Sequence, residues 1–181
     1  MTPPALAIQV LLVMLVLAAA VFDLRYRRIP NWLVLAGLLA GLAVNTWLAG
    51  WSGLRLSGLG IGLAFLVYIP LYALRAMGAG DAKLMAAVGA LTGPGPWLLI
   101  FFATALVGGV LALLFVVSKG RVRTTLSNVA FMLRELACFR PPYARNPELD
   151  VRDARAARLP HSVSVAVGCI IVVLSAHPYR G

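Results

Sequence analysis

Charged residues are scarce in this sequence, and acidic residues are the scarcest. Only 12% of the 181 residues are charged, whereas 61% are hydrophobic and the mean hydropathy is +0.91. Soluble domains carry about twice that share of charge. The composition therefore excludes an ordinary soluble domain and predicts one membrane-embedded domain over residues 1–181. The acids are Asp23, Asp81, Glu135, Glu148, Asp150 and Asp153, and only the first two lie against apolar segments.

Other shortages exclude further classes of protein. Cys138 and Cys169 are isolated, so neither a disulfide framework nor a zinc site is indicated, and we expect no metal or organic cofactor. No Lys or Arg precedes the first apolar segment, which argues against a cleaved signal peptide. The net charge of +10 does not predict a nucleic-acid partner, because the basic residues fall between apolar segments.

Long apolar runs dominate what remains. A membrane-spanning helix needs about 20 apolar residues, and a shorter run that precedes a Gly-Pro turn predicts a partly buried helix. A segment within the loop 119–160 has apolar residues at three- and four-residue spacing, which predicts an amphipathic helix on the membrane surface. We therefore expect an all-α integral membrane protein with about six transmembrane helices and a cytoplasmic interfacial helix. The six predicted helices are 5–22, 32–50, 56–74, 82–91, 97–117 and 162–176, and the interfacial one is 122–136.

The basic residues predict the orientation. Fourteen of the sixteen fall in the connections after the first, third and fifth predicted helices, and only Arg55 and Arg180 fall on the other side. Cytoplasmic loops carry the excess of Lys and Arg, so both termini are predicted outside. Asp23 ends the first helix and Asp81 begins the fourth, so both acids are predicted at the cytoplasmic surface, where they can meet.

Small residues and one amide predict close packing between helices. Asn45 is expected to hydrogen-bond a neighbouring helix. Glycines four residues apart allow membrane helices to approach closely, and the three pairs are Gly37 and Gly41, Gly58 and Gly62, and Gly89 and Gly93.

Asp23 and Asp81 each have a structural and a catalytic interpretation. Asp81 could be a helix N-cap, and Asp23 could pair with the arginines that follow it. The helix dipole predicts that Asp81 is the more readily ionised of the two. Two carboxylates that share a proton can act as the acid and base of an aspartic protease. Gly78 and Gly80 either belong to a simple loop or provide unusual backbone angles and room for an extended substrate.

Two motifs resemble those of a known family. Residues 78–84, Gly-Ala-Gly-Asp-Ala-Lys-Leu, are similar to the GxGDxKL motif of type IV prepilin leader peptidases, and Asp23 followed by Ile29, Pro30 and Asn31 is similar to their first motif. The resemblance extends over the six predicted helices. It implies an aspartic endopeptidase of the bacterial inner membrane that removes short basic leaders from prepilins, and from pseudopilins in some systems, at the cytoplasmic face. Asp23 and Asp81 would be its catalytic dyad.

The short chain is most similar to the peptidases of Flp (tight-adherence) pilus systems. Larger relatives carry a cytoplasmic insertion with paired CxxC motifs and methylate the new N-terminus, and this chain lacks the insertion. Methylation is therefore not expected. A homo-oligomer is compatible with the sequence.

Three further features accompany the resemblance. Lys83 matches the motif but is predicted to face away from Asp81 and to reach toward lipid. His161, in Leu-Pro-His-Ser where a Pro-Tyr-Gly-like run is expected, is either a substitute polar group or, as we favour, an interfacial histidine. Because the basic leader and the basic cytoplasmic face repel each other, anionic lipids are the expected common partner, and Glu148, Asp150 or Asp153 could contact the leader.

Two other functions compete with the peptidase. A proton- or cation-coupled transporter would place acids near mid-membrane and show repeated halves. A non-catalytic pilus or secretion assembly protein would not need both aspartates.

Overall fold

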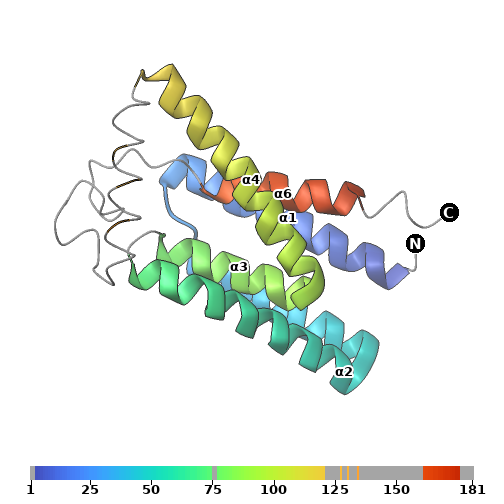
Figure 1. Ribbon diagram of the computed structural model, residues 1–181. Coiled ribbons are helices and arrows are strands. Elements are labelled where there is room, and N and C mark those ends of the chain that lie inside the picture. The colour runs from blue at the N-terminus through green and yellow to red at the C-terminus, as the bar shows by residue number, and fades with distance from the viewer. Residues whose placement is uncertain are drawn as a thin grey trace.

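All the secondary-structure elements in the described part of the chain are helices in this computed structural model (Figure 1). The structure describes residues 3–74, 77–120 and 161–175, together with residues 127, 130 and 134. The all-α prediction is confirmed for these residues. The helices are α1 (Pro3–Tyr26), α2 (Asn31–Ala73), α3 (Ala79–Thr92), α4 (Pro94–Ser118) and α6 (His161–Ser175).

α2 is folded back on itself at Gly50. This glycine has φ 57° and ψ −133°, a conformation that residues with a side chain rarely adopt. The arms 31–49 and 51–73 then run antiparallel, as Figure 1 shows, and a side chain on Gly53 would collide with the backbone of Asn45. The predicted helices 32–50 and 56–74 correspond to these two arms, although the second arm begins directly after Gly50.

α3 lies at the centre of the bundle. Every residue from Leu84 to Leu91 is buried, as expected for a helix that is apolar on all sides. Its 14 residues correspond to about 21 Å, less than the ~30 Å of a hydrocarbon core. α3 is therefore held by surrounding protein, and the indole Nε1 of Trp97 in α4 donates a 2.9 Å hydrogen bond to the Met85 carbonyl.

A buried polar cluster fastens α3 to both arms of α2. The side-chain amide of Asn45 donates hydrogen bonds to Ser57 Oγ at 3.0 Å and to the carbonyls of Ala90 and Leu91 at 2.9 and 3.1 Å. Ser57 in turn donates to the Ala90 carbonyl at 2.7 Å. The predicted hydrogen bond from Asn45 to a neighbouring helix is confirmed.

Glycines allow the backbones of α2 and α3 to touch. Side chains on Gly60 or Gly89 would collide with each other's backbone, and one on Gly41 would lie 2.7 Å from the Ala90 carbonyl carbon. The prediction is wrong for Gly58 and Gly62, which face open space. The contact glycine of this arm is Gly60, on the face that also buries Gly53, Ser57 and Ala64.

Three of the described helices, α1 (from Leu6), α2 and α4, are long and apolar enough to cross a membrane, and α6 is shorter. Six transmembrane helices therefore remain a prediction. The predicted interfacial helix 122–136 lies almost wholly outside the described residues. In Figure 1 the end of α1, the start of α3 and the start of α6 lie at the same end of the bundle, and the Gly50 turn lies at the other.

Candidate active site

Asp23 is placed by the last turn of α1. It is partly buried, and its carbonyl accepts a 2.8 Å hydrogen bond from the backbone N–H of Arg27, which ends the helix with φ 52°. The alternative of an ion pair with the following arginines is not supported within the described residues, where Arg25, Arg27 and Arg28 are exposed. The recorded partner of the Asp23 carboxylate is instead Ser162, whose hydroxyl donates to Oδ2 at 2.5 Å.

Asp81 is placed by the first turn of α3. Gly78 is the N-cap residue of this helix, so Asp81 is the third helical residue and not the N-cap. Its carboxylate accepts a hydrogen bond from the backbone N–H of Gly78, which is how an acid at this position caps a helix from inside. The prediction that Asp81 is the N-cap residue is therefore wrong, because Gly78 occupies that position. Asp81 still caps the helix, from the third helical position.

The electrostatic environment raises the pKa of Asp81. Burial is the largest cause, and the negative charge of Asp23 acts in the same direction. His161 and the Gly78 N–H lower the pKa but do not reverse the shift. The direction contradicts the expectation from the helix dipole that Asp81 is readily ionised. The electrostatic interactions of Asp81 with both Asp23 and His161 indicate that the three side chains are neighbours.

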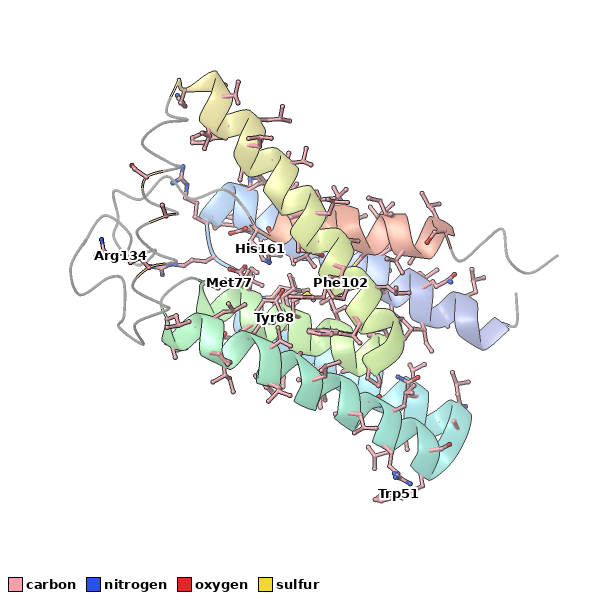
Figure 2. All side chains as sticks on the ribbon, in the orientation of Figure 1. Trp51, Tyr68, Met77, Phe102, Arg134 and His161 are labelled. Carbon is pink, nitrogen blue, oxygen red and sulfur yellow. The ribbon has the colours of Figure 1, made fainter. Side chains whose placement is uncertain are left out.

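The start of α6 closes the site. Ser162 is fully buried at 0% exposure, and it brings α6 against the end of α1. His161 is partly buried, and its Nε2 is buried without a hydrogen-bond partner in the described part of the chain. Figure 2 labels His161 at the start of α6. The favoured expectation of an interfacial histidine stays a prediction, and the buried, unpaired Nε2 is a feature that this expectation did not include.

The remaining motif residues connect α3 to the start of α2. The Lys83 ammonium donates a 3.2 Å hydrogen bond to the side-chain oxygen of Asn31, and both residues are exposed. Pro30 is the N-cap residue of α2, with φ −63° and ψ 135°. Lys83 and Asn31 thus link the two motifs to each other at the edge of the site, and Lys83 is separate from the Asp81 carboxylate.

The two motif glycines do not have unusual backbone angles. Gly78 has φ −77° and ψ 150°, and Gly80 is part of the helix. They differ in the space around them: a Cβ on Gly78 would lie 3.3 Å from Asp81 Oδ2, whereas one on Gly80 would meet Ile29 at an ordinary 3.8 Å. The missing side chain of Gly78 therefore allows the backbone at residue 78 to lie close to the Asp81 carboxylate.

Ser162 is the site residue that the sequence interpretation missed. The signal was available, since the predicted topology puts the start of the last helix at the same surface as Asp23 and Asp81. A lone serine after a histidine carries no catalytic pattern of its own, so only the packing of α6 on α1 identifies it. Among the described residues, no group of three or more His, Cys, Asp or Glu side chains is arranged to hold a metal ion.

Comparison with known proteins gives one match. The model of the type IV leader peptidase family matches residues 10–113, a segment that contains Asp23, Asp81 and the motif residues between them but not α6. No curated protein matched the chain, and no solved structure did.

Proposed function

The chain belongs to the type IV leader peptidase family, and from that premise we propose that it is an aspartic endopeptidase in which Asp23 and Asp81 activate water. Family membership supports prepilin leader peptidase activity in general, and it favours a protease over a transporter or a passive assembly protein. The proposed substrate is a Flp-type prepilin with a short basic leader, cleaved at the cytoplasmic face. Methylation of the product is not part of the proposal.

One observation carries the aspartic mechanism. Asp23 and Asp81 are 58 positions apart in the chain, yet the charge of Asp23 acts directly on Asp81, which is partly buried. Two interacting carboxylates that cannot both ionise easily are the arrangement that an aspartic protease requires.

The two carboxyls have different surroundings, which assigns their roles. Asp81, with its raised pKa, keeps the shared proton, whereas Asp23 accepts a hydrogen bond from Ser162, an interaction that favours a carboxylate. In the proposed reaction Asp23 removes a proton from water as the oxygen attacks the scissile carbonyl carbon, and Asp81 gives its proton to the carbonyl oxygen. The tetrahedral intermediate, which carries two hydroxyls, then collapses: one hydroxyl returns its proton to Asp81 as the C=O bond forms again, the C–N bond breaks, and the proton held by Asp23 passes to the leaving amine.

The bilayer is the proposed meeting place of enzyme and substrate. Arg25, Arg27 and Arg28 are exposed beside the site, so they repel a basic leader but attract anionic headgroups. We propose that the same headgroups gather the leader, while the apolar prepilin helix lies in the membrane next to the enzyme.

The test is co-expression with a Flp-type prepilin, with leader removal followed by gel mobility and by mass of the product. Asp23→Asn and Asp81→Asn should each reduce cleavage about 10²- to 10⁴-fold, while both variants accumulate as the wild type does. Because the carboxyls act as a unit, the double variant should be scarcely worse than either single one. Normal cleavage by either single variant would remove the aspartic mechanism.

A further inference from the structure

We propose that the start of α6 is a third part of the active site, in which Ser162 fixes the orientation of Asp23 and His161 controls how tightly the two carboxylates hold their shared proton. The inference rests on the proposed aspartic mechanism and deepens it. Both residues lie outside the segment that matches the family model, and both are positioning residues, since they act through Asp23 and Asp81.

Ser162 has one evident task. It is 0% exposed, and its hydroxyl donates to Asp23 Oδ2 at 2.5 Å across 139 positions of sequence. A hydrogen bond to one carboxylate oxygen restricts rotation of the group and leaves the other oxygen for water. It also stabilises the negative charge that a general base must carry before it takes a proton.

Packing alone does not explain why a polar histidine ring lies at this position. Its Nε2 is buried and lacks a partner among the described residues, and leaving such a group unsatisfied costs about 1–3 kcal/mol. Both carboxylates raise the pKa of His161, although burial lowers it more. A polar nitrogen that stays unpaired and interacts with two acids is available to exchange a proton with them or to hydrogen-bond the substrate.

The other titratable groups near His161 do not outweigh its electrostatic interaction with the two aspartates. Asp23 comes from α1 and Asp81 from α3, and both act on His161 directly. Tyr68 of α2 interacts with Asp81, but a tyrosine is ordinarily uncharged below pH ~10. Lys83 is exposed and bonded to Asn31, and α4 carries no ionisable side chain. Among the described residues, Asp23 and Asp81 are therefore the acids that act on a charged His161.

The sign of the coupling gives a definite expectation. The positive charge of protonated His161 stabilises the negative charge of the Asp81 carboxylate, and it therefore lowers the pKa of Asp81. Replacing His161 by a neutral residue removes that effect, so the pKa of Asp81 rises further. The mechanism requires Asp81 protonated, and His161 carries its charge only below its lowered pKa. The loss of activity on the alkaline side should therefore begin at acidic pH in the wild type, below about 6.5, and move to higher pH in the variant.

The first test measures kcat/KM against pH on a synthetic prepilin peptide. His161→Gln should move the alkaline limb upward by on the order of one pH unit, whereas His177→Gln, which replaces the other of the two histidines, should leave it in place. An unchanged limb in active His161→Gln enzyme would overturn the role of His161.

A second test does not depend on activity. With only two histidines in the chain, ring resonances of isotopically labelled protein in detergent can be assigned with His177→Gln. The titration midpoint of His161 should fall by about one pH unit in Asp23→Asn, because the carboxylate charge of Asp23, which raises the pKa of His161, is lost. A midpoint unaffected by Asp81→Asn and by Asp23→Asn would refute the coupling. A shifted midpoint in a protein that cleaves no prepilin would refute the proposed function and retain the coupling.

The role of Ser162 is tested separately. Ser162→Ala should lower kcat about 10- to 100-fold with little change in KM, and Ser162→Thr, which keeps the hydroxyl, should restore part of it. Ser164→Ala is the matched control, because Ser164 is buried at 4% exposure two residues along α6. If Ser162→Ala were as active as Ser164→Ala, the hydrogen bond to Asp23 would have no part in catalysis.

Discussion

At Gly78 the absence of a side chain determines the surroundings of Asp81. Gly78→Ala would place a Cβ 3.3 Å from Asp81 Oδ2, whereas Gly80→Ala would place one at 3.8 Å from Ile29. Both glycines have backbone angles that alanine adopts freely. We expect Gly78→Ala to reduce kcat about tenfold by displacing the carboxylate, without loss of accumulated protein.

Gly80→Ala is the matched comparison and tests a different role. If Gly80 provides room for an extended substrate, the variant should fold normally and raise KM with kcat retained. The measurement for both is kcat and KM on the same synthetic prepilin peptide. Equal kcat values for Gly78→Ala and the wild type would contradict the steric argument at Asp81.

The sequence identified single functional residues where their type is rare in the surrounding segment. Asp23 and Asp81 were identified because an acid against an apolar segment is costly. The helix dipole led us to expect a readily ionised Asp81, but the dipole contributes at most about 2 kcal/mol, and burial raises the pKa of Asp81 instead. Ser162 was missed because a serine in an apolar helix is unremarkable until its partner 139 positions away is known.

At the scale of elements, the contact between α2 and α3 depends on which glycines face it. A Cβ on Gly60 would collide with the Gly89 backbone, whereas one on Gly58 meets nothing within 4 Å. Gly60→Ala should therefore destabilise the protein by about 1–3 kcal/mol through overpacking. Gly58→Ala should stabilise it by about 0.5–1 kcal/mol, because alanine is the better helix former.

The measurement is the thermal unfolding midpoint in detergent, where the two variants should move in opposite directions from the wild type. Asp81 is carried by α3, so Gly60→Ala should also lower peptidase activity, although Gly60 lies far from the site in sequence. Movement of both midpoints in the same direction would show that α2 and α3 do not meet along this face.

Hydropathy predicted which segments are helical but not which faces meet. The break near residue 50 was found because the long apolar stretch divides there into two runs of about 20 residues, 32–50 and 56–74. The glycine pair Gly58 and Gly62 has the expected spacing, but spacing does not reveal rotation of the helix about its axis. The burial of Gly53, Ser57, Gly60 and Ala64 defines that rotation, and it depends on α3, whose backbone approaches this face.

At the scale of the whole molecule, the fold gathers three helix ends at one end of the bundle. The end of α1 supplies Asp23, the start of α3 supplies Asp81, and the start of α6 supplies His161 and Ser162. The Gly50 turn lies at the opposite end (Figure 1). The proposed reaction requires the end of the bundle that carries Asp23 and Asp81 to face the cytoplasm, as the distribution of basic residues predicts.

Two matched serine-to-cysteine variants test that orientation. Ser52 is exposed next to the Gly50 turn, and Ser118 is exposed at the end of α4, which lies toward the same end of the bundle as the end of α1 and the start of α3 (Figure 1). In intact cells a membrane-impermeant maleimide should label Ser52→Cys, and it should label Ser118→Cys only after the cells are made permeable. The wild type measures the background, because Cys169 is buried and Cys138 belongs to the loop predicted to be cytoplasmic. The reverse pattern would place Asp23 and Asp81 outside the cell, where they could not reach a leader that has not crossed the membrane.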